Sequence, residues 1–319
     1  MNKIYNIAGV SKQSVHQQNK RQAIFEDRLY KLMLETDLLR SEHPGCGVEK
    51  MYYTLDPDWL GRDKFIEIFM ELGYRVKKLK NYIRTTIPAH FKYPNLIQGM
   101  QVIRKNQLWQ TDITYFKVGS QYYYLVFIID VYTRRLLGYS VSNHLRAEAN
   151  IKALRMAIKN CGGSIRGLIH HSDRGSQYID KEYTKILTDK GAHISMGEKA
   201  QDNAYAERIN GIIKNEYLSY WEIKTFNQLK TKVKKAVENY NTKRIHRELP
   251  NKNTPIRFEK KLLTLYSQKR PMMIIYAEGN YKIKEASSLL DFMPKKEPQT
   301  HNCPIVINNN CLTKTVNLI

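Results

Sequence analysis

Residues 108–143 read LWQTDITYFKVGSQYYYLVFIIDVYTRRLLGYSVSN, a stretch rich in aromatic and β-branched residues. Gly119 and Ser120 interrupt it once, and the polar residues 133–135 interrupt it again. Aromatic and β-branched side chains favour strands and short polar breaks favour turns, so we expect three strands joined by tight turns. The middle strand is apolar on both faces, which indicates a central position or a cover of helices.

The segments that follow alternate between helical and strand patterns. Three meandering strands followed by such an alternation predict an α/β domain, a mixed five-stranded sheet with helices on both faces, over residues 107–265. The later elements are expected as helix, strand, helix, strand and helix, at 147–160, 167–173, around 181–191, 193–196 and 203–217.

The segments before this domain suggest helices. Residues 1–40 have the outline of a partial helix-turn-helix, with Gly9 at the turn and Ser11 as the cap of a helix that buries Val15. A capped surface helix is an equally good interpretation. Residues 41–86 show apolar side chains at helical spacing and predict a small helical DNA-binding domain that includes a stop at Gly73. Residues 87–106 are expected to be a linker, and residues 266–319 are a tail of unknown role.

The charge of the chain points to a polyanionic partner. Lys and Arg total 52 against 30 Asp and Glu, and the excess is concentrated in residues 74–105 and 224–270. The longest apolar run, residues 122–129, is far shorter than the ~20 residues that span a bilayer. We therefore expect nucleic acid rather than a membrane, although a basic strip can also be a solvated face.

The first residues lack the apolar stretch of a signal peptide, so we expect a cytoplasmic protein with free thiols. Cys46 and Cys161 are isolated, and His301, Cys303 and Cys311 lack the paired spacing of a zinc site. Neither a disulfide framework nor a zinc site is expected.

Two aspartates belong to neighbouring strands of the predicted sheet. Asp112 lies within the first strand, where an unpaired charge would be too costly to bury. Asp173 ends the fourth strand, in the stretch HHSDRGSQY at 170–178, and a right-handed crossover places that strand beside the first. The two carboxylates are therefore expected to share one edge of the sheet. Of His170 and His171, one should face the core and the other the site.

A third carboxylate, Glu207, lies on the helix expected at 203–217. Its side of that helix also carries Asn203 and Lys214, while Ile209 and its neighbours form the core stripe. Alone, Glu207 would be read as a solvent-facing residue. Together, two Asp and one Glu suit a pair of Mg²⁺ ions acting on phosphorus, with Asp112 between the ions.

Other residues compete for these roles. Asp130 ends the second strand and suits the cap of the following turn, and Asp202 is expected to cap the Glu207 helix. His171 and Arg174 have the spacing that tyrosine recombinases use on phosphate, but no tyrosine nucleophile can be picked out and the carboxylates would stay unexplained.

Five ordered blocks carry a resemblance to a known family. They read WQTDITY, FIIDVYTRRLLGY, HHSDRGSQY, DNAYAERINGIIKNE and YNTKRIHRELPNKNTP. Together they resemble the integrase-type transposases of bacterial insertion sequences, the IS-three family, which is similar in its catalytic pattern to retroviral integrases. The resemblance covers roughly residues 75–260. It implies a ribonuclease-H-like core.

The resemblance also implies an Asp-Asp-Glu triad that binds two Mg²⁺ or Mn²⁺ ions. Residue by residue, the triad falls on Asp112, Asp173 and Glu207, with Lys214 as the basic residue that contacts DNA. Only 33 residues separate Asp173 from Glu207, against the family's usual 35, which we expect a trimmed loop to absorb.

These observations favour a transposase that cuts DNA at element ends, joins a 3′-hydroxyl to target DNA and assembles as a homo-oligomer on DNA. The alternatives are a catalytically inactive integrase-like DNA-binding regulator and a ribonuclease-H-like nuclease. The residues expected to contact DNA are Lys214, Asn203, Arg174, Arg208, Lys77, Lys78, Lys80 and Arg84.

Overall fold

A computed structural model describes residues 11–76, 93–197, 200–265 and 270–275. Its centre is a five-stranded sheet with strand order β4-β3-β2-β5-β6. The first three strands in the chain pair antiparallel, and the last two run parallel to β2. This confirms the predicted mixed sheet, whose strands are β2 (Leu108–Val118), β3 (Gln121–Asp130), β4 (Leu136–Ser142), β5 (Ile169–Ser172) and β6 (His193–Met196).

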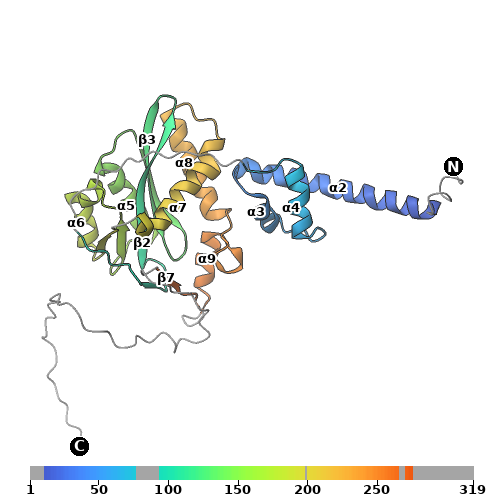
Figure 1. The fold of residues 1–319 in the computed structure, drawn as a ribbon. Helices are drawn as coiled ribbons and strands as arrows, with labels where there is room; N and C mark the ends of the chain where they lie inside the picture. Colours follow the sequence, from blue (N-terminus) through green and yellow to red (C-terminus); the bar gives the residue numbers. More distant parts are fainter. Residues whose placement is uncertain (1–10, 77–92, 198–199, 266–269, 276–319) are drawn as a thin grey trace, which may run out of the picture. The chain divides into compact units, whose positions relative to one another are not determined.

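Helices cover both faces of this sheet, as predicted (Figure 1). On one face, α5 (Ala147–Asn160) and α6 (Lys181–Asp189) close a core around the buried indole of Trp109. On the other face, α7 (Ala204–Ile212) and α8 (Phe226–Thr242) bury Phe127 and Tyr240. Strand β3 contributes residues to both cores, so both of its faces are apolar.

Strand alternation and register decide which side chains reach the α7 face. Trp109 packs in the α5 core, so Gln110 and Asp112 lie on the opposite face, where each contacts α7 or the turn before it. Parallel pairing joins Gln110 to His171. Two residues further along the same register, Asp173 follows the end of β5 beside Asp112.

The helix with Glu207 is built from four consecutive pieces. A 3-10 turn (Ala200–Asn203) leads into α7, which a π-helical turn (Ile213–Tyr217) and a second 3-10 turn (Leu218–Tyr220) continue. The expectation that Asp202 caps this helix is wrong, because the N-cap position belongs to Asn203 and carries no side-chain cap. No sequence pattern indicated the wider π turn, which shifts the side chains after Ile212 around the helix axis.

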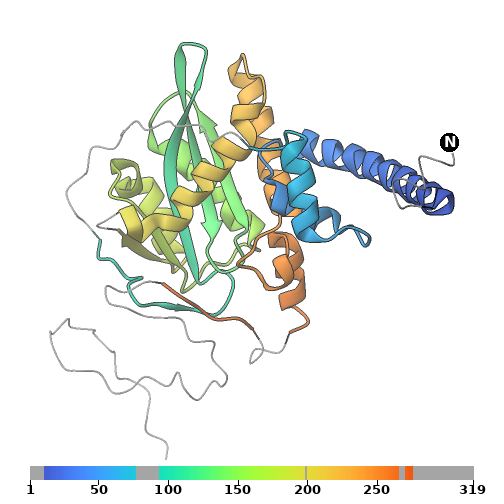
Figure 2. The same cartoon turned by 45° about the vertical axis from the view of Figure 1, so that its right-hand side comes forward.

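The region before the core is helical. It contains α2 (Lys12–Glu42), α3 (Val48–Leu55) and α4 (Arg62–Glu71) (Figure 2). Ser11 caps α2 and Gly73, with φ +84°, ends α4, as predicted. Helix α2 runs without a break across the expected boundary at residue 40. Its Leu32 packs with Phe65 of α4 in one apolar core, so the two expected regions share a core. Gly9 and the first helix of the expected helix-turn-helix lie outside the described residues.

Short segments on either side of the core pack against it. Strand β1 (Gln101–Val102) pairs with β7 (Met273–Ile274), and buried Ile97 and Val102 join a core with α9 (Pro255–Leu262). The described parts of the expected linker and tail thus pack with the domain that contains the five-stranded sheet. Two further 3-10 turns are Ser176–Ile179 and Pro250–Lys252.

A buried ion network joins the helical region to the core at Glu216. Arg244 donates two hydrogen bonds of 2.8 Å to its carboxylate, His43 Nε2 lies 2.7 Å away, and Lys50 Nζ lies 3.0 Å away. Gly45 N–H also donates to the carbonyl of Glu216 at 2.7 Å. The π turn after α7 is therefore held by residues of the helical region and by Arg244 from the loop after α8.

None of the described helices is long and apolar enough to cross a bilayer.

Candidate active site

Asp112 is a half-buried carboxylate on the central strand. Its Oδ1 accepts a hydrogen bond from the Ile113 N–H at 2.8 Å, and its Oδ2 accepts one from Asn210 Nδ2 at 2.8 Å. Burial, followed by the charges of Asp173 and then Glu207, raises the pKa of Asp112 to about 8. The charges of the two other predicted carboxylates thus both act on Asp112.

Asp173 stands in the turn after β5. Its Oδ1 accepts a hydrogen bond from the Gly175 N–H at 3.1 Å, which fixes the carboxylate at the sheet edge. Burial raises its pKa. Glu207 projects from the first turn of α7 with an exposed side chain, and partial burial together with the charge of Asp173 raises its pKa as well. The charge of Asp173 therefore disfavours the ionisation of both Asp112 and Glu207.

Lys214 lies on the same side of the α7 helix. Its Nζ donates to Thr114 Oγ1 at 2.7 Å and stands 5.5 Å from the ring centroid of Tyr115. Burial lowers the pKa of Lys214, and the charge of Asp112 partly opposes that shift. The ammonium group is thus held on the sheet, two residues along β2 from Asp112.

The other residues expected to contact DNA occupy different settings. Asn203 is buried and its Nδ2 donates to the carbonyl of Thr111 at 2.8 Å, which anchors the start of α7 to the sheet. Arg208 is exposed and pairs with Glu248 at 3.0 Å, while Arg174 is half-buried. Lys77, Lys78, Lys80 and Arg84 lie outside the described residues.

Asp130 behaves as the predicted turn cap. Its Oδ2 accepts hydrogen bonds from Oγ1 and the N–H of Thr133, and its Oδ1 accepts one from the Asn106 N–H. Oδ2 therefore fixes the β3–β4 turn, and Oδ1 holds the segment before β2. Cys46 and Cys161 are free thiols.

The two adjacent histidines divide between the faces of the sheet, as expected. His170 Nε2 lies 3.0 Å from the hydroxyl of Tyr183 on α6, and His171 Nδ1 lies 2.8 Å from Ser195 Oγ. His171 is on the α7 face, where the charge of Asp202 acts on it. Both rings are buried, and burial lowers the pKa of His170 to about 3 and that of His171 to about 4.

Asn210 is a site residue whose role the sequence analysis missed. Its position three residues after Glu207 puts it on the same side of α7, which was the available signal. Only the tertiary structure shows that the side chain of Asn210 faces the sheet whereas that of Glu207 is exposed.

The carboxylates suit hard divalent cations in their chemistry. They are oxygen-only donors, and their mutually raised pKa values mark a place where positive charge would be stabilising. Among the described residues, no group of three or more His, Cys, Asp and Glu side chains surrounds a single ion position. Two ions that each contact only two carboxylates do not require such a group.

The strand order and the three electrostatically coupled carboxylates define a ribonuclease-H-like core. Two protein-family models, both described as integrase core domain, match this part of the chain over residues 103–201 and 191–255. The magnesium-bound catalytic core of the HTLV-2 integrase is similar with a TM-score of 0.39 and 21% identity, over 51% of this chain and 98% of that one. The fold class follows from the strand order β4-β3-β2-β5-β6, with three antiparallel strands followed by two parallel ones.

Proteins of insertion elements are more similar in sequence. A 31 kDa protein of insertion element IS600 from Shigella sonnei is 35% identical over 198 residues, which are 60% of this chain and 72% of the relative. The transposase of IS904 from Lactococcus lactis is 34% identical over 57% of this chain and 72% of its own length. The putative transposase of IS986/IS6110 from Mycobacterium tuberculosis is 31% identical, over 54% and 66%. The chain belongs to the integrase-core family of insertion-sequence transposases.

Proposed function

We propose that this protein cuts DNA at the ends of its element and joins the freed 3′-hydroxyl to a phosphate of target DNA. The observation that carries the proposal is the coupling of Asp112, Asp173 and Glu207, which are far apart in the chain but share one edge of the α7 face. Clustered carboxylates with raised pKa values are typical of sites that act on phosphate through divalent ions.

The side chains divide the work. Asp112 would hold both of two Mg²⁺ or Mn²⁺ ions, and Asp173 and Glu207 would hold one each. When bound, such ions stabilise charge on the attacking and leaving oxygens at phosphorus. Asn210 keeps the Asp112 carboxylate in one orientation through its hydrogen bond. Lys214, fixed on Thr114, presents a cation for a DNA phosphate beside the carboxylates.

DNA is the proposed partner because the net charge of +22 favours a polyanion. The helical region 12–71 is proposed as a DNA-binding unit, and Arg174 and Arg208 as further phosphate contacts. Assembly of several copies on DNA is part of the same proposal.

The test compares Asp173→Asn with the unmodified protein on duplexes that carry the terminal repeats of the element. We expect Mg²⁺-dependent strand cleavage and strand transfer from the unmodified protein and neither from the variant, because the amide removes a charged metal ligand. DNA binding should persist in the variant. Asp180→Asn is the matched control, since Asp180 is the N-cap of α6 and asparagine caps a helix equally well.

Each failure has a distinct meaning. Full activity of Asp173→Asn would exclude the triad. Binding without any cleavage by the unmodified protein would favour an inactive DNA-binding regulator, and cleavage without joining would favour a ribonuclease-H-like nuclease.

A further inference from the structure

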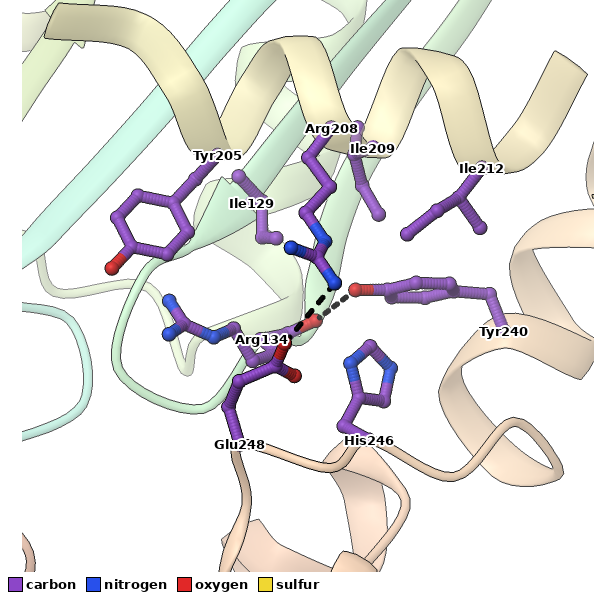
Figure 3. Close-up of a pocket in the computed structure, with 9 residues that line it drawn as sticks. All are labelled: Ile129, Arg134, Tyr205, Arg208, Ile209, Ile212, Tyr240, His246 and Glu248. Carbon is purple, nitrogen blue, oxygen red and sulfur yellow. Dashed lines mark hydrogen bonds and ion pairs between the residues drawn. The ribbon is translucent and has the colours of Figure 1, made fainter. Parts of the chain in front are cut away.

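A hollow of about 180 Å³ lies on the flank of α7 (Figure 3). Helix α7, the end of α8 with the loop that follows it, and the β3–β4 turn enclose it. Its lining combines apolar, aromatic and charged side chains, namely Ile129, Arg134, Tyr205, Arg208, Ile209, Ile212, Tyr240, His246 and Glu248.

Arg134 is a buried cation that lacks a carboxylate partner. It is 9% exposed, its Nη1 donates to the carbonyl of Val131 at 2.7 Å, and its guanidinium carbon lies 4.1 Å from the ring centroid of Tyr205. Within the described residues, no carboxylate comes within ion-pair distance of it. The charge of Arg134 acts on Glu248 only at longer range. A buried guanidinium without an ion pair is costly, so this position still favours an anion.

The backbone around Arg134 is also fixed. Arg134 has a left-handed φ of +61°, and its carbonyl accepts a hydrogen bond from the buried Tyr240 hydroxyl at 3.0 Å. Non-glycine residues held in this conformation are uncommon and concentrate at ligand sites. The guanidinium is therefore presented by a rigid turn rather than by a free loop.

The remaining charged groups leave the pocket positive. Arg208 pairs with Glu248 at 3.0 Å across the mouth, and both side chains are largely exposed. Burial, then Arg244 and Arg134, lower the pKa of His246 to about 2, so its ring is neutral at physiological pH. The pocket thus holds two guanidinium groups against one carboxylate.

The pocket lies close to the candidate active site. Ile129 pairs with Gln110, two residues before Asp112 on the same sheet face. Arg208 directly follows Glu207, and consecutive side chains diverge by roughly 100° around a helix. A DNA strand that meets Glu207 on one flank of α7 can therefore reach Arg208 and the pocket on the next.

We propose that this pocket binds a backbone phosphate of a DNA strand held across α7, with Arg134 and Arg208 as its ligands. In the free protein Glu248 forms an ion pair with Arg208, and the phosphate replaces Glu248 as the partner of Arg208 when DNA binds. The proposal rests on DNA as the partner in the proposed function and assigns it a specific contact point. Two guanidinium groups suit a phosphate because each can donate two parallel hydrogen bonds.

The test measures binding of a fluorescent duplex with the terminal repeat over a series of salt concentrations. Arg134→Gln and Arg208→Gln should each weaken binding several-fold and lower the slope of log K against log salt by about 0.9, the loss of one phosphate contact. Glu248→Gln should tighten binding because it removes the competing anion. Arg155→Gln is the charge-matched control, since Arg155 pairs with Glu182 on the exposed surface beyond the opposite sheet face.

A second arm adds inorganic phosphate to the protein without DNA and follows thermal unfolding against chloride at equal ionic strength. Equal effects of Arg134→Gln and Arg155→Gln on DNA binding overturn the proposal, as does weaker binding by Glu248→Gln. Stabilisation by free phosphate that Arg134→Gln removes, with DNA binding unchanged, assigns the pocket to a free anion and also overturns it. If Arg134→Gln does not fold, the exposed Arg208 and Glu248 decide the outcome.

Failure of the proposed function is separable from these outcomes. It shows as absent Mg²⁺-dependent cleavage by the unmodified protein, whereas the pocket is judged by binding alone.

Discussion

Asp112 depends on a single side-chain partner for its orientation. Asn210 donates the hydrogen bond at its Oδ2, and the Asn210 side chain is itself buried, so no solvent competes for this contact. A carboxylate that must hold cations needs such support, because a ligand that rotates freely loses its preorganisation.

We predict that Asn210→Ala lowers the rate of Mg²⁺-dependent cleavage by about 10- to 100-fold, the usual effect of removing a group that orients a metal ligand. DNA affinity should stay unchanged, because the side chain of Asn210 is buried between α7 and the sheet and does not present a surface to DNA. Single-turnover cleavage rates and equilibrium binding measure the two quantities separately.

Asn215→Ala is the control, since Asn215 lies five residues later on the same helix and is exposed. Equal rates for both variants would show that Asp112 needs no support from Asn210.

The residues of the candidate site were predictable to different degrees. Asp112 and Asp173 followed from strand order, because parallel neighbours bring their ends to one edge of a sheet. Asn203 was expected to contact DNA, yet it is buried under α7 and bonded to Thr111. Helical spacing gives the side of a helix but not what that side meets.

At the scale of elements, the π turn at residues 213–217 gives the α7 helix two opposite attachments. Lys214 points to the sheet, whereas Glu216 enters the ion network with Arg244, His43 and Lys50. Burial alone would raise the pKa of Glu216, but the hydrogen bonds from Arg244 and His43 and the nearby positive charges outweigh it, and the pKa lies well below the ordinary value.

We predict that Glu216→Gln lowers the free energy of unfolding by about 3–5 kcal/mol near neutral pH, because it leaves the buried Arg244 without its counter-charge. Chemical denaturation followed by circular dichroism measures this difference. Glu222→Gln is the control, since its ion pair with Lys224 is more than two-thirds exposed and worth little.

The effect should also depend on pH in one direction. Because the folded-state pKa of Glu216 is lowered, its contribution is complete above the unfolded value near 4.5 and declines as the pH falls below it. The stability gap between the unmodified protein and Glu216→Gln should therefore narrow in acid. A gap that is constant down to pH 3 would contradict the ionised state of Glu216.

At the scale of the whole molecule, several basic residues of the stretch 224–270 contact other parts of the protein and are not free to bind DNA. Lys243 pairs with Glu42, Arg247 pairs with Glu49, and Lys252 lies over the ring of Tyr53. Together with Arg244 on Glu216, these cations join the core to the helical region. The net charge therefore overstates how many cations in this stretch are available to a polyanion.

The helical region and the core are in such close contact at Gly45 that a single added methyl group tests the contact. A Cβ at Gly45 would clash with the backbone of Glu216, whereas a Cβ at Gly47 would meet nothing within 4 Å. We predict that Gly45→Ala separates the unfolding of the helical region from that of the core, so that calorimetry shows two transitions where the unmodified protein shows one.

Gly47→Ala should keep the single transition and lose only the modest advantage of glycine at an N-cap. Two transitions already present in the unmodified protein would show that the regions unfold independently.

The sequence by itself predicted the class of fold and singled out the three carboxylates as candidates, because strand and helix periodicities and the order of elements can be read along the chain. The family blocks strengthened that assignment. Tertiary structure alone decided that Asn210 donates to Asp112, that Glu216 contacts Arg244, Lys50 and His43, and that Arg134 lines a pocket in which no described carboxylate pairs with it. These facts join residues distant in the chain, and no local pattern encodes which side chains long-range packing brings together.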